Sequence, residues 1–350
     1  LPVLLVINVR SMSTSAAALV HGFQNYDPDV QLVGVICNQT SSKTHFSQVK
    51  ESIEKDCKLP VVGHLPFKKF LDLPERHLGL VPGWEITHLE KWLDHCADFF
   101  LKNVNLNQII DLMIPLEEYS IIPSQWTRFS QSKKIRIGVA YDRVFHFYYS
   151  DSLESLRSNG AELVYFSPLN DRLIPEGLDG LIIGGGFPEM FAMMLSHNQS
   201  MRHSIKTAIE NGLPTYAECG GMMYLAREIE DHINRFYPMV GIFPVKAIMS
   251  KRLQHFGYVE VKVIRNNILA PSGTVLHGHE FHYSELIGSL PSSSYQVKKP
   301  NQKYTWNSGF VYKNCLASYV HLHFAAYPEL ISNFLNHCRL WKKNHSYLTS

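Results

Sequence analysis

The sequence lacks the features that mark membrane and nucleic-acid-binding proteins. Its apolar runs, such as residues 3–7 (VLLVI), fall far short of the roughly 20 residues that span a bilayer, and its first residues lack the basic region of a secretory signal. Its 33 basic and 31 acidic residues leave a formal net charge of +2, so no strong positive field is available to nucleic acid. We therefore expect a cytoplasmic protein that binds neither nucleic acid nor membrane.

Cysteine is also sparse and unpaired. Six cysteines are scattered over 350 residues without a CxxC spacing, which excludes a disulfide framework and a four-thiolate zinc site. The HExxH pattern is absent too, and we predict no metal site. The histidine-rich segment 277–282 (HGHEFH), together with His321 and His323, leaves a metal-dependent hydrolase as a minor alternative.

What is present is ordinary globular composition with an α/β pattern. Hydrophobic residues make up 45% and charged residues 18%, and the length suits two domains. Apolar runs alternate with amphipathic stretches, which predicts parallel sheets covered by helices. The predicted segments are strands at 2–9, 31–38, 60–65, 135–140, 162–167, 178–183 and 213–217, and helices at 13–24, 43–56, 84–103, 106–113, 152–159, 200–211 and 222–229.

A change of composition divides the chain. Residues 115–134 are rich in Ser, Gln, Pro and Lys and show no apolar periodicity, which is typical of a linker. The predicted organisation is a first domain at 1–115, a linker at 116–133, a second domain at 134–335 and a polar tail at 336–350.

Cys219 stands where a predicted buried strand runs into a helix, with Gly220 and Gly221 immediately after it. This is the pattern of a nucleophile elbow, in which a tight turn presents the side chain and small neighbours admit a substrate. The helix N-terminus that follows is expected to lower the pKa of the thiol. The alternative is a packing cysteine beside a turn.

A thiol that attacks a carboxamide also needs an oxyanion hole and a proton carrier. Gly186 ends a Gly-Gly-Gly turn after a strand, and its backbone N–H is predicted to hold the oxyanion together with that of Gly220. Residues 319–324 (YVHLHF) predict a strand that places His321 and His323 on one face, so the base is expected there. A plain flexible turn and structural histidines are the alternatives.

Five ordered segments resemble a known family. They are residues 140–149 (AYDRVFHFYY), 184–189 (GGGFPE), 216–224 (YAECGGMMY), 278–284 (GHEFHYS) and 318–324 (SYVHLHF). Residues 135–330 resemble a class I glutamine amidotransferase domain of the cobyrinate type, and the chain is similar to the cobyrinate (hydrogenobyrinate) a,c-diamide synthases. The resemblance implies an α/β glutaminase domain and a glutamine-hydrolysing carbon–nitrogen ligase.

The first 115 residues resemble the later part of that family's synthetase domain, which is similar to dethiobiotin synthetase. Residues 11–18 (SMSTSAAA), 34–38 (GVICN) and 73–80 (LPERHLGL) carry this likeness. It implies ATP and Mg²⁺ as cofactors and Asn38 as an adenine contact. The family's GxxxxGK[ST] P-loop is absent from the sequence, so the fold expected is a partial P-loop-type parallel-sheet domain followed by the glutaminase domain. We expect a fragment of a longer gene product, with a degenerate gene product as the alternative.

The resemblance also assigns roles. Cys219 would be the nucleophile and His321 the base, with His323 as the second candidate. Many class I domains place a glutamate two residues after the histidine, where this sequence has His323, so the third member is unassigned.

The predicted function is ATP- and glutamine-dependent amidation of the a and c carboxylates of cobyrinate or hydrogenobyrinate in cobalamin biosynthesis. The implied partners are L-glutamine, a cobyrinate-type tetrapyrrole and, in a homodimer, a second copy of the chain. The alternatives are a,c-diamidation of nickel-sirohydrochlorin and a non-catalytic truncated remnant that binds a tetrapyrrole.

Overall fold

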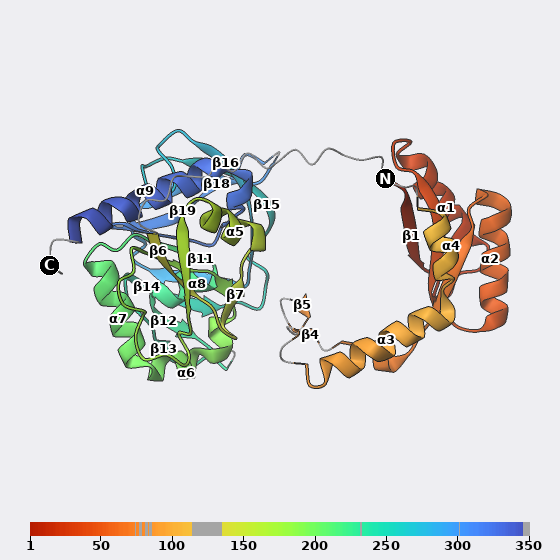
Figure 1. Cartoon of the computed structure of the whole chain (residues 1–350), viewed down its shortest axis with the longest axis horizontal. Helices are drawn as coiled ribbons and strands as arrows, with labels where there is room; N and C mark the ends of the chain where they lie inside the picture. Colours follow the sequence, from red (N-terminus) through yellow and green to blue (C-terminus); the bar gives the residue numbers. More distant parts are fainter. Residues whose placement is uncertain are drawn as a thin grey trace. The chain divides into compact units, whose positions relative to one another are not determined.

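The computed structural model describes residues 1–73, 75–76, 79–80, 83, 86–113, 135–231, 233–300 and 302–345 (Figure 1). The chain divides into two compact units, Leu1–Ile121 and Ile122–Ser350. The predicted linker, 116–133, lies outside the described residues.

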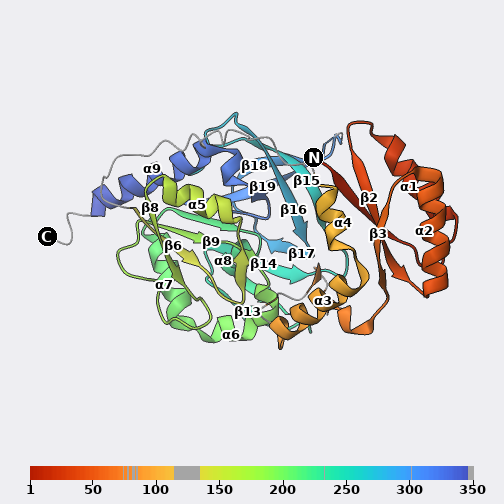
Figure 2. The same ribbon diagram turned by 45° about the vertical axis from the view of Figure 1, so that its right-hand side comes forward.

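The first unit is built on a parallel three-stranded sheet, as the apolar runs predict. Its strands lie in the order β1–β2–β3, and helices cover both faces (Figure 2). The elements are β1 (Val3–Asn8), α1 (Ser15–Tyr26), β2 (Leu32–Thr40), α2 (Lys43–Cys57), β3 (Val61–Pro66), α3 (Leu89–Asn103) and α4 (Leu106–Asp111), with a two-stranded piece, β4 (Glu75–Arg76) and β5 (Gly79–Leu80), and a short 3₁₀ turn, η1 (Lys69–Leu71), before α3. Helix α3 therefore begins later than the predicted residue 84.

Strand β2 explains why the first unit needs helices on both faces. Val35 and Cys37 are buried in a cluster with residues of α1 and α2, whereas Ile36 is buried in a second cluster with residues of α3 and α4. Successive side chains of a strand point to opposite faces, so a continuous apolar run requires cover on each side.

The second unit contains a ten-stranded mixed sheet. Its parallel part has the order β8–β6–β9–β11–β20, and antiparallel strands extend it in the order β19–β18–β15–β16–β21. The strands are β6 (Ile135–Ala140), β8 (Ala161–Phe166), β9 (Gly180–Ile183), β11 (Thr215–Glu218), β15 (His255–Val263), β16 (Val275–His282), β18 (Ser293–Lys298), β19 (Thr305–Tyr312), β20 (Cys315–Ser318) and β21 (His321–Leu322). Of the antiparallel extension, the sequence pattern predicted only the segment of β21, which lies within the expected strand at 319–324.

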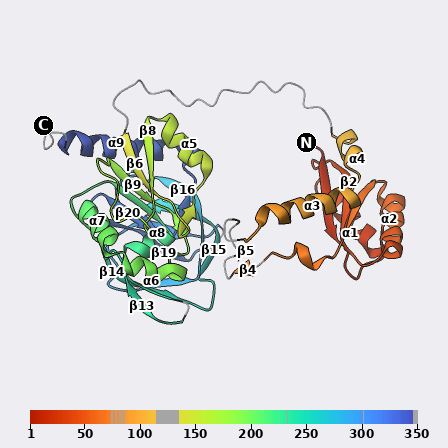
Figure 3. The same ribbon diagram turned by 60° about the horizontal axis from the view of Figure 1, so that its bottom comes forward.

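Helices cover both faces of the parallel part (Figure 3). One face packs against α6 (Ala192–His197), α7 (Gln199–Glu210) and α8 (Gly220–Leu225), and the other against α5 (Ser150–Ser158) and α9 (Pro328–His345). Beside this sheet lie a four-stranded sheet of β12 (Ala226–Glu230), β13 (Phe236–Pro238), β14 (Phe243–Met249) and β17 (Ser284–Gly288), the short pair β7 (Phe145–Phe147) and β10 (Gly185–Gly186), and the 3₁₀ turns η3 (Pro188–Phe191) and η4 (Phe324–Ala326). The predicted helix at 222–229 ends early, because residues from Ala226 join a sheet.

The predicted polar tail from residue 336 is wrong as far as residue 345. Helix α9 runs to His345, and it buries an apolar face made by Leu330, Ile331, Phe334, Leu335 and Cys338. These positions recur at helical spacing, so the burial continues beyond the predicted end of the domain. Residues 346–350 lie outside the described part of the chain.

Among the residues that the structure describes, no helix has the length and apolar character required to cross a membrane.

Candidate active site

Cys219 occupies the turn between β11 and α8, as the sequence predicts. Its backbone angles, φ 49° and ψ −105°, lie outside the regions that residues with a Cβ atom favour, and such strain is found at nucleophile elbows. Its N–H donates to the carbonyl of Ser318 (2.7 Å), and its carbonyl accepts from Met223 (3.1 Å). These bonds hold a residue that is only 6% exposed at the carboxyl ends of β11 and β20.

Glycines let the elbow lie directly on the backbone of the neighbouring loop. A Cβ atom on Gly221 would lie 2.1 Å from the carbonyl oxygen of Ile183, and one on Gly220 would lie 2.9 Å from the backbone nitrogen of Gly186. Gly186 itself has a φ of 154°, and a Cβ there would lie 1.6 Å from the oxygen of Val144. The structure thus brings together Gly186 and Gly220, the two predicted oxyanion donors, whose role stays a prediction.

The ionisation of the thiol differs from the sequence-based expectation. Burial, and next the charge of Glu189, raise the pKa of Cys219 to about 12, and a hydrogen bond from the Gly220 backbone opposes this only in part. Helix α8 has six residues, so its N-terminal potential does not outweigh the loss of hydration. The thiol is protonated at rest and needs a base to become a nucleophile.

His321 lies in the same site. It is 8% exposed and pairs with His279 across strands β21 and β16, and the two rings stack with their centroids 4.8 Å apart. A Cβ atom on Gly185 would lie 2.9 Å from Cε1 of His321, so the imidazole faces the glycine turn. Burial, and then the charges of His279 and His282, lower the pKa of His321 to about 3, which leaves the ring neutral at neutral pH. A neutral imidazole can accept a proton.

Glu218 is the residue that sequence reasoning missed. Its Oε1 lies 3.8 Å from Nδ1 of His321, and its Oε2 accepts hydrogen bonds from the Tyr216 hydroxyl (2.7 Å) and the Leu322 backbone (2.8 Å). Burial raises the pKa of Glu218 to about 7. The available signal was a carboxylate at the end of an apolar strand, directly before the candidate nucleophile.

His323, the second candidate base, has another partner. Strand β21 ends at Leu322, and the predicted strand through 324 is interrupted because η4 begins at Phe324. Nε2 of His323 lies 2.8 Å from Oδ2 of Asp151, and its side chain is 40% exposed. The carboxylate that holds His323 belongs to α5, whereas His321 faces Glu218.

Asn38, the predicted adenine contact, belongs to the first unit. It lies within β2, and its side-chain oxygen accepts a hydrogen bond from the backbone of Gln39 (2.9 Å). Its role stays a prediction.

The histidine-rich strand β16 splits its side chains between two faces. Glu280 and His282 are buried, whereas His277 and His279 lie toward the other side, where the Tyr327 hydroxyl contacts His277. In the parts of the chain that the structure describes, no three His, Cys, Asp or Glu residues are arranged to hold a metal ion.

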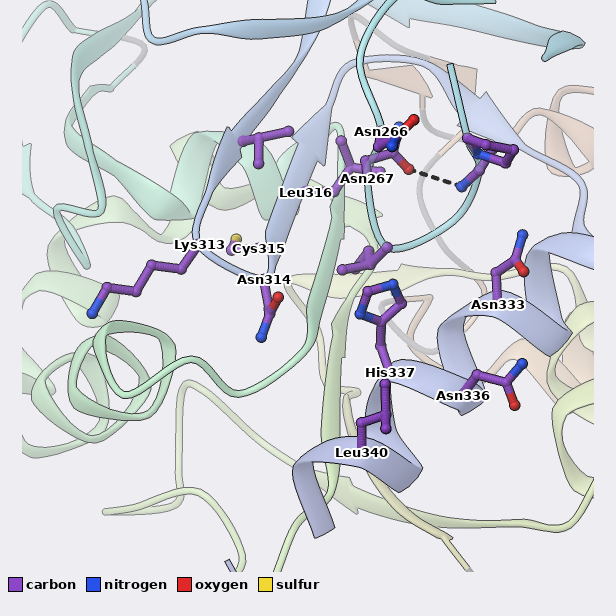
Figure 4. Close-up of a pocket in the computed structure, with 14 residues that line it drawn as sticks. Asn266, Asn267, Lys313, Asn314, Cys315, Leu316, Asn333, Asn336, His337 and Leu340 are labelled. Atoms are coloured by element: carbon purple, nitrogen blue, oxygen red, sulfur yellow. Dashed lines mark hydrogen bonds between the residues drawn. The ribbon is translucent and has the colours of Figure 1, made fainter. Parts of the chain in front are cut away.

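A cavity of about 490 Å³ lies at the opposite end of β20, beneath α9 (Figure 4). Asn266, Asn314, Cys315, Asn333 and His337 are among its lining residues. Cys315 begins β20, whereas Ser318 ends it beside Cys219, so this cavity contains none of the predicted site residues.

Comparison with known proteins agrees with this geometry. Residues 136–329 match the model of the CobB/CobQ-like glutamine amidotransferase domain. A cobyrinate a,c-diamide synthase of Caldanaerobacter subterraneus is 44% identical over 337 residues, which cover 96% of this chain and 74% of that protein. Those of Dehalococcoides mccartyi and Listeria monocytogenes are each 41% identical, and the matches cover 95% and 92% of this chain and 73% and 71% of those proteins.

A solved structure, a glutamine amidotransferase from Thermotoga maritima, matches with a TM-score of 0.39 at 13% identity. That match covers 61% of this chain and 90% of the other.

Proposed function

The chain belongs to the cobyrinate a,c-diamide synthase family, and we propose that its second unit hydrolyses L-glutamine at Cys219 to supply ammonia for the amidation of a cobyrinate-type tetrapyrrole. The relatives' name supports the acceptor, with its a and c carboxylates as the groups amidated. The observation that carries the proposal is the convergence of the strained Cys219 elbow, the Gly186–Gly220 backbone pair and His321 at one edge of one sheet.

The chemistry follows from these groups. His321 accepts the thiol proton as the sulfur of Cys219 attacks the amide carbon of glutamine. The backbone N–H groups of Gly186 and Gly220 stabilise the negative charge on the carbonyl oxygen. The proton then passes from His321 to the departing nitrogen, which leaves as ammonia, and water hydrolyses the thioester to glutamate and free thiol.

Burial of the thiol and of the imidazole suits this order of events. Both groups are neutral at rest, because burial raises the pKa of Cys219 to about 12 and lowers that of His321 to about 3. Proton transfer therefore has to accompany attack on the bound substrate. Reaction of the resting Cys219 thiol with unrelated electrophiles is disfavoured.

Amidation of a carboxylate needs activation, and ATP with Mg²⁺ is the activating pair that we propose for the complete reaction. The residues present do not fit the triphosphate, because no GxxxxGK[ST] sequence occurs in these 350 residues. We therefore assign no ligand of the triphosphate in this chain and derive no step through the nucleotide.

Glutamine hydrolysis by the 350-residue chain tests the proposal. We expect glutamate formation by the wild type and its loss in Cys219→Ala, whereas Cys96→Ala, a change of a half-buried cysteine on α3, retains it. A chloroketone analogue of glutamine should alkylate Cys219 alone, as read by peptide mass spectrometry. An inactive folded wild type, or an active Cys219→Ala, would refute the proposal.

A further inference from the structure

We propose that Glu218 is a positioning residue, whose carboxylate orients the imidazole of His321 through Nδ1 and so serves as the third member of the site. This inference rests on the proposed glutaminase function. In many class I domains a glutamate two residues after the histidine is the third member. In this chain the third member would instead be the glutamate directly before Cys219.

The strand order places Glu218 beside His321. Strands β11 and β20 are parallel, with Glu218 opposite Ser318, so the chain that leaves β20 passes the end of β11 and reaches His321 three residues later. Strand β21 then fixes His321 by pairing it with His279. Glu218 and His321 therefore meet because two neighbouring strands end at the same edge of the sheet.

One oxygen of Glu218 is anchored and the other faces His321. The Tyr216 hydroxyl and the Leu322 N–H both donate to Oε2, which leaves Oε1 directed at Nδ1 of His321 over 3.8 Å. This separation exceeds a hydrogen bond, and such contacts at resting sites shorten when substrate binds. The second donor, Leu322, is the next residue after His321, so the same carboxylate holds the backbone and faces the ring.

The arrangement selects one tautomer. A carboxylate at Nδ1 favours the proton on that nitrogen, which leaves Nε2 free to accept the thiol proton. Once Nε2 is protonated, the ring is a buried cation, and the nearby carboxylate offsets its charge. Without an acceptor at Nδ1, the tautomer with its proton on Nε2 competes and cannot act as the base.

The carboxylate of Asp151, which lies beside the residue that follows β21, is already paired with another histidine. Asp151 on α5 lies 2.8 Å from Nε2 of His323 and so holds a different ring. It provides a matched control, since Asp151→Asn removes a carboxylate–histidine contact two residues beyond His321.

The ionisation of Glu218 gives a readout that a packing role would not produce. Burial raises its pKa to about 7, and the hydrogen bonds from Leu322 and Tyr216 lower it from a still higher value. The titratable groups that contact Glu218, or whose pKa its charge affects, are His321, Cys219, Tyr148, Tyr149, Tyr216 and Tyr295. The tyrosines titrate far above neutrality and His321 well below it. Glu280 on β16, whose pKa is also about 7 and whose charge affects Cys219, is the other group that titrates in this range, so a rise in activity near pH 7 reports Glu218 only if Glu218→Gln abolishes it.

The experiment measures kcat and KM for glutamine hydrolysis by the full chain from pH 5.5 to 9. We expect Glu218→Gln to lower kcat at least about tenfold and to leave KM within about twofold, because the glutamine contacts are unchanged. The rise of wild-type kcat near pH 7 should disappear in this variant, and Glu218→Asp should restore part of the rate. Asp151→Asn should keep the wild-type rate and profile.

A second variant covers the case in which Glu218→Gln fails to fold. Tyr216→Phe keeps the carboxylate but removes one hydrogen bond to its charged form, so the rise in kcat should move to higher pH while the plateau is retained. Wild-type kcat in Glu218→Gln, or an unmoved profile in Tyr216→Phe, overturns the inference and leaves the glutaminase intact. A wild type without glutaminase activity refutes the proposed function, and the inference falls with it.

Discussion

Glu280 on β16 should make the stability of the second unit depend on pH. Its side chain is 1% exposed, its Oε1 accepts only a long hydrogen bond from Trp306 (3.4 Å), and its Oε2 has no hydrogen-bond partner among the described residues. Nε2 of His282 lies 4.0 Å from Oε2 and is likewise unpartnered in the described part of the chain. We expect Glu280→Gln to stabilise the protein at alkaline pH.

The magnitude follows from the pKa of Glu280, which burial raises from 4.5 to about 7. The folded pKa exceeds the unfolded one, so the favourable contribution of the protonated carboxyl is complete below pH 4.5 and is lost as pH rises through 7. At ~1.4 kcal/mol per pKa unit, the ionised group costs about 3 kcal/mol of unfolding free energy at pH 8. Glutamine removes the charge, keeps the shape and adds an amide donor for His282.

The assay is urea unfolding at pH 5 and pH 8.5 read by pulse proteolysis, in which the surviving fragment identifies the unit. Glu280→Gln should match the wild type within about 1 kcal/mol at pH 5 and exceed it by about 3 kcal/mol at pH 8.5. The control is Glu285→Gln, the same change at an exposed position on β17, and it should show no such divergence. Equal pH slopes for wild type and Glu280→Gln would show that the carboxylate is hydrated and the reasoning wrong.

Four further outcomes are expected. Gly22→Ala in the interior of α1, where no atom lies within 4 Å of an added Cβ, should raise the unfolding free energy by about 0.5–1 kcal/mol in urea titrations. Gly221→Ala should lower glutamine hydrolysis more than about tenfold in a steady-state assay, because its Cβ would lie 2.1 Å from the carbonyl oxygen of Ile183. Phe334→Ala, which removes a fully buried ring from the apolar face of α9, should cost about 3–5 kcal/mol by the same urea titrations. Iodoacetamide at pH 8 should label the half-buried Cys96 before the buried Cys219 in peptide mapping, and the reverse order would contradict the raised pKa of the Cys219 thiol.

Local sequence features predicted the first unit and the elbow well. The runs that form β1, β2 and β3 are mostly apolar. The central strand β2 is buried on both faces from Gly34 to Cys37 and has no polar side there, whereas β1, at the edge of the sheet, exposes Val3 and Val6. Cys219 was recognisable because a short apolar strand, one reactive residue and two glycines in succession leave few conformations other than a tight strand-to-helix turn. In both cases the information lies within a few consecutive residues.

The end of the second unit was harder to predict. Residues 336–345 contain several polar and basic side chains, and their membership of α9 depends on an apolar stripe that begins at Leu330 and has to meet the sheet to be buried. In the antiparallel extension, consecutive strands pair with each other (β15 with β16, β18 with β19, and β19 with β20). The strand order also requires β15 to pair with β18 and β16 with β21, across intervening strands, and no local pattern encodes those pairings.

The sequence by itself determined the tight turn at Cys219 and its glycine neighbours, because the constraints on such a turn are local. Tertiary structure alone separated the two candidate histidines, since it buries His321 beside Glu218 and leaves His323 partly exposed beside Asp151. It also decided the charge of the thiol, since burial among carboxylates outweighs the potential of a short helix. These properties arise from distances between residues more than a hundred positions apart, and folding of the sheet sets those distances.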